Sequence, residues 1–282
     1  SEQSALLRRL RQGQFDAAIA LFSRWRTAWL LWRAGIPYRL APATKLAQFL
    51  YNHRLVQRRS RSAKPESQYN LDLIRHFLQQ HKLDVVEPQP PYLQFADGLL
   101  VAVRGDTAGQ LGINPAKPWL MVHCGSGGSA NNLTLEQYAA LILGLQQQYP
   151  DYPCVLTAGP GEGEMAAALE ALVQQGGGHA SIYHSREGLP RFCQVIANAA
   201  LFVAGSTGPL HIAGALDVPT VGFFPARRSA TPLRWQPLNS EGRHLAIAAP
   251  TLGDGQNMHL ISVSETLPVI QSWFAGLQTP ER

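Results

Sequence analysis

Two patterns of hydrophobic and polar positions alternate between residues 119 and 277. Short apolar runs, each bounded by Gly, Pro or Ser, are typical of strands buried on both faces. Longer segments with apolar residues three and four positions apart predict helices between them. Helices alternating with apolar strands indicate a parallel sheet covered on both sides. The strands are expected at 119–123, 153–158, 181–184, 201–204, 220–224 and 245–249, and the helices at 135–148, 165–174, 189–200, from Pro209 onward and at 263–277.

The first part of the chain carries a weaker version of the same pattern. It predicts helices at 5–11, 24–34 and 69–80, and strands at 15–22 and 38–42. Residues 106–117 are polar and contain Gly and Pro, so we expect a linker there. We therefore predict an α/β protein of two Rossmann-like domains, spanning residues 1–108 and 109–282.

One strand–turn–helix unit, LFVAGSTGPLHIAGALDVPTVGFF at 201–224, suggests chemistry. Its Gly-Ser-Thr-Gly turn leads into a helix whose first N–H groups have no partner within the helix. Together with the helix dipole they form a site for an anion such as phosphate. His211 lies about one helical turn further on, on the same side. An ordinary turn with a capping Ser or Thr remains the other interpretation.

Charge is distributed unevenly along the sequence. Residues 1–104 contain 16 Lys and Arg but 7 Asp and Glu, whereas the remaining residues contain 8 and 12. A basic first domain suits an anionic partner, either a phosphorylated substrate or an acidic membrane face. The alternative for the basic cluster at 54–64 is a solvated loop of positive charges without a partner. No nucleic-acid recognition motif accompanies the charge.

Several classes of protein are disfavoured by composition. No apolar run approaches the roughly 18 residues of a membrane span, and the first residues lack the apolar core of a signal peptide. Cys124, Cys154 and Cys193 are too few and too scattered for a disulfide framework or a zinc site. We expect three buried thiols in a protein of a reducing compartment, hence cytoplasmic.

Three segments in this order resemble the heptosyltransferase-like glycosyltransferases, the ninth sequence family of inverting nucleotide-sugar enzymes. They are FDAAIALFSRWRTAWLLWRAGIPYRL in the first domain, HCGSGGSANNL at the start of the second, and AGSTGPLHIAGALDVPTVGFF. The resemblance spans most of residues 5–275. It implies a GT-B architecture, in which the second domain binds the nucleotide sugar and the first supplies the acceptor side.

The resemblance also implies a set of donor-binding residues. Ser206, Thr207 and Gly208 would hold the diphosphate of an ADP-sugar, with His211 close to it. Ser126 and Gly127 in the other turn would contact the same donor, and Glu162 is a candidate for the ribose hydroxyls. Trp235 is a candidate to cover the nucleotide, and Arg227 or Arg228 to reach phosphate, although a plain surface loop is the alternative. His123 is interpreted as orienting its loop by hydrogen bonding rather than as catalytic.

The chain departs from the family in two ways. Members usually begin with a strand and a glycine-rich loop whose aspartate supplies the catalytic base, and that segment is absent here. We expect either a fragment of a longer product or a protein that has lost its base, so the catalytic residue is unassigned. Members also commonly carry Lys or Arg after the GSGG turn, where this chain has Asn131 and Asn132. An amide can hydrogen-bond a phosphate but supplies no countercharge.

The expected activity is an inverting transfer of a heptose-type sugar from an ADP-sugar to a phosphorylated lipopolysaccharide inner core. We expect it to need no metal or other cofactor, because no Asp-x-Asp cluster is suitably placed. The acceptor would be reached at the inner face of the cell membrane. The alternatives are the same fold with another nucleotide sugar, such as a UDP-sugar, and a non-catalytic nucleotide-sugar or glycan-binding protein. An NAD-binding protein fits least, since GPGEGEM does not supply the dinucleotide fingerprint.

Overall fold

The chain folds into two compact units, residues 1–87 and 88–282. The computed structural model describes residues 2–125, 131–252 and 255–278. Both units are built on a parallel sheet, as the sequence predicts, and each is described by itself. Within the described residues, no helix is long and apolar enough to cross a membrane.

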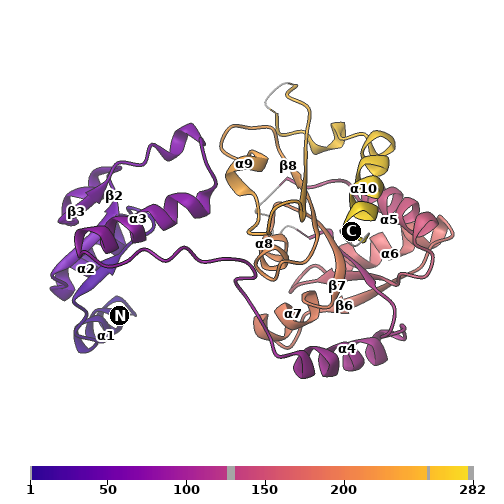
Figure 1. Cartoon of the computed structure of the whole chain (residues 1–282), viewed down its shortest axis with the longest axis horizontal. Helices are drawn as coiled ribbons and strands as arrows, with labels where there is room; N and C mark the ends of the chain where they lie inside the picture. The colour runs from indigo at the N-terminus through magenta and orange to yellow at the C-terminus, as the bar shows by residue number, and fades with distance from the viewer. Residues whose placement is uncertain (1, 126–130, 253–254, 279–282) are drawn as a thin grey trace. The chain divides into compact units, whose positions relative to one another are not determined.

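The first unit holds a three-stranded parallel sheet in the order β1-β2-β3 (Figure 1). Helix α2 follows β1 and ends at Gly35, whose φ of 80° places it in the left-handed region that glycine adopts without strain. A small apolar core beneath this helix includes Ala28, Ala41 and Tyr51. The elements are β1 (Ala17–Ile19), β2 (Tyr38–Pro42), β3 (His53–Leu55), α1 (Glu2–Gln12), α2 (Trp25–Ala34), α3 (Glu66–Gln80) and the 3₁₀ turns η1 (Leu46–Leu50) and η2 (Arg59–Arg61).

The second unit holds a six-stranded parallel sheet in the order β6-β5-β4-β7-β8-β9. Every neighbouring pair runs parallel, with β7 beside β4 and β8 beside β7. The strand order therefore reverses between β4 and β7. The strands are β4 (Trp119–His123), β5 (Cys154–Ala158), β6 (Ala180–His184), β7 (Ala199–Gly205), β8 (Thr220–Phe224) and β9 (His244–Ala248).

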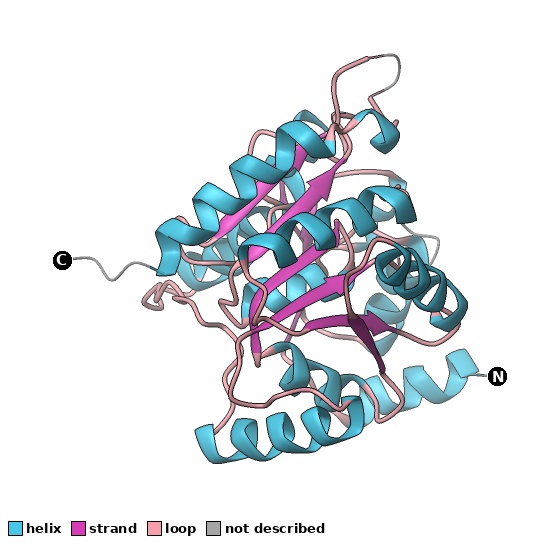
Figure 2. Ribbon diagram, turned by 90° about the vertical axis from the view of Figure 1, so that its right-hand side faces the viewer, coloured by secondary structure: helices cyan, strands magenta, loops and turns pink. Residues whose placement is uncertain are grey.

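Helices cover both faces of this sheet, which explains why its central strands are apolar throughout (Figure 2). Along β4, Trp119 and Met121 enter one core while Leu120 and Val122 enter the other. This two-residue alternation is what a pleated strand with two buried faces requires. One face carries α5 (Leu135–Gln148), α6 (Gly163–Gln175) and α10 (Val263–Gln278), and the other carries α4 (Asp97–Leu111), α7 (Leu189–Ile196) and α8 (Gly208–Ala215).

Helix α4 is the main departure from the sequence-based expectation. The linker expected at 106–117 is wrong in its first part, because the helix runs on to Leu111 and stops at Gly112, with φ of 65°. Val103 and Ala108 of α4 are buried in the second unit. The division between the units therefore falls at Glu87–Pro88, ahead of α4, where the sequence placed it at 108–109. The apolar residues of α4 do not mark a single face of the helix, so its hydrophobic pattern is a weak signal.

The three cysteines are free and buried, as expected. Burial raises the pKa of the Cys124 thiol to about 11 and that of Cys154 to about 12. Both thiols therefore stay protonated near neutral pH and behave as small apolar side chains.

The partly buried His244 predicts acid sensitivity of the second unit. The Thr220 hydroxyl donates to Asn239, so His244 Nδ1 donates to that hydroxyl at 2.8 Å. Its Nε2 is buried without a hydrogen-bond partner among the described residues. Burial lowers the pKa of His244 to about 4, with a further contribution from His211. Because the unfolded chain binds this proton near pH 6.5, stability is complete above that pH and falls as the pH drops toward 4.

We expect the free energy of unfolding to fall by about 2 kcal/mol between pH 7.5 and pH 5 through this group. Urea unfolding at the two pH values measures the change. His244→Gln should reduce the difference, whereas the matched variant of the exposed His179 should retain it. An unchanged pH dependence in His244→Gln would show that another group is responsible.

Candidate functional site

A cavity of about 490 Å³ opens at the carboxyl ends of β7 and β8. Ser206 and Thr207 follow β7, and Pro225 follows β8. The edge formed by strand carboxyl ends, near a reversal of strand order, is where open parallel sheets bind ligands. The cavity is lined by Asn131, Ser206, Thr207, Gly208, His211, Pro225, Arg227, Ser229, Ala230, Trp235 and Gln256.

The amino end of α8 points its free N–H groups at this cavity. Thr207 is the N-cap residue, yet its hydroxyl donates to the Gly205 carbonyl at 3.3 Å and makes no capping bond. The N–H groups of Gly208 and Leu210 therefore lack an intrahelical acceptor, and Pro209 between them has no N–H. Partial positive charge thus collects at the cavity wall.

His211 and Trp235 form one side of the cavity. Their rings meet edge to face, with centroids 6.4 Å apart. Trp235 comes from the short helix α9 (Pro232–Trp235), and its indole N–H donates to the Ser229 carbonyl at 2.9 Å. Burial lowers the pKa of His211, so the free protein carries a neutral imidazole at neutral pH. The arrangement offers a flat apolar surface beside a polar ring.

Among the residues that the structure describes, the lining contains one cation and no carboxylate. The exposed Arg227 lies 3.5 Å from the Gln256 side-chain oxygen through one guanidinium nitrogen. Gln256 in turn accepts a bond at its backbone carbonyl from Asn131 Nδ2, at 3.1 Å. A guanidinium and free helix N–H groups, with no acidic side chain among the described lining residues, favour an anionic ligand.

Asn132 joins the loop after β4 to the end of β7. Its amide nitrogen donates to the Cys124 carbonyl at 2.8 Å, and its oxygen accepts from the buried Tyr138 hydroxyl at 2.5 Å. A Cβ at Gly205 would lie 2.5 Å from that oxygen, so only glycine fits there. The amide of Asn132 is therefore used inside the fold, whereas Asn131 reaches the cavity.

Glu162 lies beyond β4, at the carboxyl end of β5. Its carboxylate accepts the Gly159 N–H at 2.8 Å and lies 3.7 Å from His123 Nε2. A Cβ at Gly125 would overlap this carboxylate, which explains a glycine at that position. The same edge of the sheet therefore carries an acidic side chain, but Glu162 does not line the cavity.

His123 is held by the neighbouring strand. Its Nδ1 lies 3.1 Å from the backbone oxygen of Thr157 and 3.0 Å from the hydroxyl of that residue. Burial lowers the pKa of His123, opposed by the negative charge of Glu162 and by the bond to the Thr157 backbone. These contacts to β5 fix the ring between two strands. The expected role of His123 in orienting its loop stays a prediction, because residues 126–130 of that loop lie outside the described residues.

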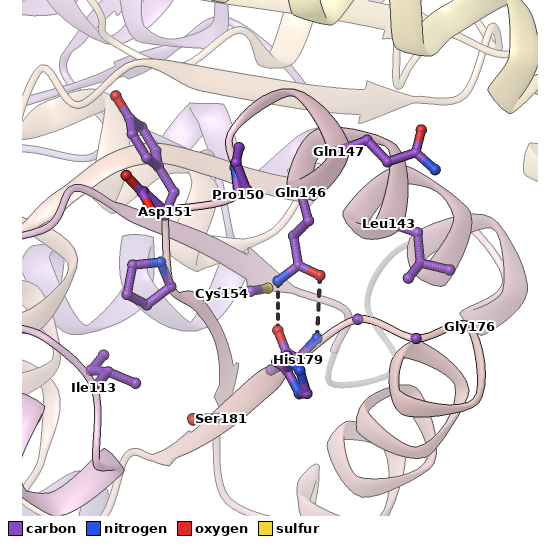
Figure 3. Close-up of a pocket in the computed structure, with 15 residues that line it drawn as sticks. Ile113, Leu143, Gln146, Gln147, Pro150, Asp151, Cys154, Gly176, His179 and Ser181 are labelled. Carbon is purple, nitrogen blue, oxygen red and sulfur yellow. Dashed lines mark hydrogen bonds between the residues drawn. The ribbon is translucent and has the colours of Figure 1, made fainter.

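A second hollow, of about 500 Å³, lies at the opposite edge of the sheet, where β5 and β6 begin (Figure 3). Two of its polar side chains, Gln146 and Asp151, are engaged within the protein. Gln146 bonds to the backbone oxygen and N–H of His179, at 2.6 and 3.3 Å. Asp151 pairs with Lys117 at 2.9 Å. The hollow offers neither a free helix end nor a charge at a strand carboxyl end, so the cavity beside α8 is the better candidate.

The structure thus groups Ser206, Thr207, Gly208 and His211 in one cavity, and places Glu162 at the same sheet edge but outside it. Ser126 and Gly127 lie outside the described residues. Sequence reasoning missed Gln256 and Pro225. Pro225 follows an apolar strand, so the rule that ligands bind at the carboxyl ends of parallel strands could have identified it. Gln256 is brought to the cavity only by the tertiary fold.

The model of glycosyltransferase family 9, the heptosyltransferase family, matches residues 3–256 of this chain. The chain belongs to this family. The match covers both units, including the strand–turn–helix that builds the cavity wall. The resemblance drawn from the three sequence segments is therefore confirmed, and with it the assignment as a glycosyltransferase.

A related protein of Haemophilus influenzae, provisionally named a glycosyltransferase, is 48% identical over 273 residues. The alignment covers 96% of this chain and 78% of the relative.

Solved structures of family 9 share the fold. The Escherichia coli ADP-heptose lipopolysaccharide heptosyltransferase II has a TM-score of 0.74 at 21% identity, covering 99% of this chain and 82% of that one. A family 9 glycosyltransferase of Veillonella parvula has a TM-score of 0.76 at 14% identity, covering 97% and 78%. An E. coli heptosyltransferase solved with ADP has a TM-score of 0.68 at 17% identity, covering 96% and 77%. These similarities confirm the predicted GT-B fold.

Asn132 and Asn131 form a matched pair that tests the internal role of Asn132 in this family 9 protein. Asn132→Ala removes the donor to the Cys124 carbonyl and leaves the buried Tyr138 hydroxyl without its acceptor. We expect a loss of about 2 to 3 kcal/mol in the free energy of unfolding. Asn131→Ala removes one exposed hydrogen bond and should cost less than about 0.5 kcal/mol. Chemical denaturation measures both, and equal losses would refute the distinction.

Proposed function

We propose that this family 9 glycosyltransferase transfers a heptose-type sugar, with inversion, from an ADP-sugar to a phosphorylated lipopolysaccharide inner-core acceptor. The observation that carries the proposal is the amino end of α8, which directs free N–H groups into a cavity whose described lining contains Arg227 and no carboxylate. A nucleotide diphosphate is the ligand class that such a wall suits best.

The proposal assigns the donor diphosphate to Ser206, Thr207 and Gly208, with His211 beside it. The hydroxyl of Ser206 can donate to a phosphate oxygen, and that of Thr207 can do so by exchanging its bond to the Gly205 carbonyl for one to phosphate. Glycine at 208 lets a phosphate approach the backbone. No heavy atom lies within 4 Å of the position that a Cβ would take at Gly208. Space for a ligand therefore exists directly at the helix end.

The chemical demand in this reaction is the charge that grows on the leaving diphosphate. Preorganised N–H donors and a guanidinium stabilise that charge without having to reorganise during the reaction. His211 is neutral in the free protein because burial lowers its pKa. A bound diphosphate favours the imidazolium, so His211 can gain a proton as negative charge develops beside it. These groups act on the leaving group, and the base for the acceptor is not assigned.

The rest of the donor is assigned to the same sheet edge. We place the ribose hydroxyls near Glu162, whose carboxylate is a good acceptor and is already oriented by the Gly159 N–H. Ser126 and Gly127 complete the proposed donor set. Trp235, 36% exposed beside His211, offers a ring to cover the nucleotide.

The acceptor side is assigned to the basic first unit. A phosphorylated glycolipid core is anionic, and the sequence concentrates Lys and Arg in this part of the chain. We place the reaction in the cytoplasm, at the inner face of the cell membrane, where such an acceptor would be anchored.

A different nucleotide sugar is the second candidate. Asn131, rather than a cation, faces the cavity on the side of the loop after β4. An amide contributes less to diphosphate binding than a cation does. Contacts to the base and the sugar therefore supply a larger share of the binding energy, and these contacts decide which nucleotide sugar is preferred. Calorimetric comparison of ADP-heptose with UDP-sugars separates the two candidates, since only the preferred donor should bind tightly.

Substitutions at the helix end test the donor site. Thr207→Ala removes a hydroxyl at the cavity wall, and His211→Ala removes the polar ring beside the proposed diphosphate. We expect the affinity for ADP-heptose to fall roughly tenfold in each variant, about 1.4 kcal/mol. Isothermal titration calorimetry measures the change.

The control is His179→Ala, which alters a histidine at the opposite edge of the sheet. It should bind ADP-heptose like the unmodified protein. Unchanged affinity in both Thr207→Ala and His211→Ala, with the fold intact, would overturn the site assignment.

A further inference from the structure

Large apolar side chains project into solvent along one edge of the small sheet in the first unit. Phe22 and Trp25 follow β1, Leu46 and Phe49 follow β2, and Val56 follows β3. Because the three strands are parallel, the segments that follow them meet at a single edge. Their exposed fractions are 51% for Phe22, 63% for Trp25, 76% for Leu46, 70% for Phe49 and 69% for Val56.

These side chains stand on a rigid base. In η1, Ala47 is buried in the core beneath α2 while Leu46 and Phe49 on either side of it are exposed. The loop after β2 is tied to β3 by the Ala43 N–H, which donates to the Leu55 carbonyl at 2.8 Å. The loop after β1 is tied to β2 through the Ser23 hydroxyl and the Pro42 carbonyl. The exposed apolar groups are therefore held in place rather than collapsed onto the fold.

Positive charge surrounds them. Residues 17–65 contain ten Lys and Arg and no Asp or Glu. The Arg54 guanidinium lies 5.9 Å from the Phe49 ring centre, and the Arg59 guanidinium 5.3 Å from that of Phe22. Of the exposed cations that no described carboxylate pairs with, five lie in or near the segments that follow the strands: Arg24, Lys45, Arg54, Arg58 and Arg61. We call these five cations and the five apolar residues the basic–apolar edge.

We propose that the basic–apolar edge docks this protein on an anionic lipid bilayer. The apolar side chains enter the boundary between headgroups and acyl chains, where aromatic rings and Leu are favoured. The cations pair with lipid phosphates at the same depth. An acidic protein or a nucleic acid would satisfy the charge but would leave Leu46 and Phe49 in water.

The inference extends the proposed function, which requires the enzyme to reach an acceptor embedded in a membrane. Docking on a bilayer also explains why apolar side chains, whose exposure to water is unfavourable, are placed among cations. Several large exposed apolar side chains at one edge of a folded unit mark an interaction site.

Vesicle co-sedimentation of the whole chain tests the proposal. The probe is vesicles of phosphatidylcholine with about 30% phosphatidylglycerol, compared with phosphatidylcholine alone. We expect binding to the anionic vesicles that weakens with added salt. Leu46→Ser with Phe49→Ser should weaken vesicle affinity at least roughly tenfold, and Arg58→Gln with Arg61→Gln roughly 30-fold.

The matched control is Leu83→Ser with Val86→Ser, which removes two exposed apolar side chains of the same unit outside the basic–apolar edge. It should bind vesicles normally. Circular dichroism of each variant confirms that it is folded. Loss of binding in the cation variant but not in the Leu46 and Phe49 variant would overturn the proposal, since simple charge adsorption would then suffice. Absence of binding to anionic vesicles would overturn it as well.

Calorimetry with ADP-heptose on the same samples separates this inference from the proposed function. A protein that binds the donor but no vesicles refutes only the docking surface. A protein that binds vesicles but no nucleotide sugar refutes the proposed function and leaves the docking surface standing.

Discussion

The second unit depends on one amide, that of Asn132, at the point where the strand order reverses. Asn132 donates to the Cys124 carbonyl after β4, accepts from the buried Tyr138 hydroxyl, and packs directly against Gly205 at the end of β7. The turn that begins α8 therefore has a fixed starting point, and the free N–H groups of that helix face the cavity in a defined direction.

The cavity follows from this geometry with few additional elements. Parallel strands bring the ends of β7 and β8 to one edge, Pro209 and the N-cap Thr207 start α8 there, and the segment carrying Trp235 covers His211. The N–H groups at the cavity wall therefore come from the fold itself, and Arg227 adds a positive charge to them. In the first unit, parallel strands likewise bring the following loops together, but with different residues. Its strand ends also gather their loops at one edge, but those loops are apolar and basic instead of glycine-rich.

Much of this architecture could be predicted from the sequence because the second unit obeys simple rules. The strands at 119–123 and 220–224 were expected with the bounds that the structure has, since each is an apolar run between turn residues. Helix α4 could not be predicted, because Thr107 on its buried face is polar while Leu99 and Val101 are apolar and exposed. The placement of Ser206, Thr207, Gly208 and His211 together followed from one local motif. The roles of Asn132, Gln256 and His123 depend on contacts between distant segments, which no local pattern reveals.

The central claim is that a nucleotide diphosphate binds at the amino end of α8. A crystal structure of the protein with ADP tests it most directly. The account predicts diphosphate oxygens within hydrogen-bonding distance of the backbone N–H of Gly208, with His211 and Arg227 nearby. Density for ADP in the hollow at the beginning of β5 and β6, with the cavity beside α8 empty, would contradict it.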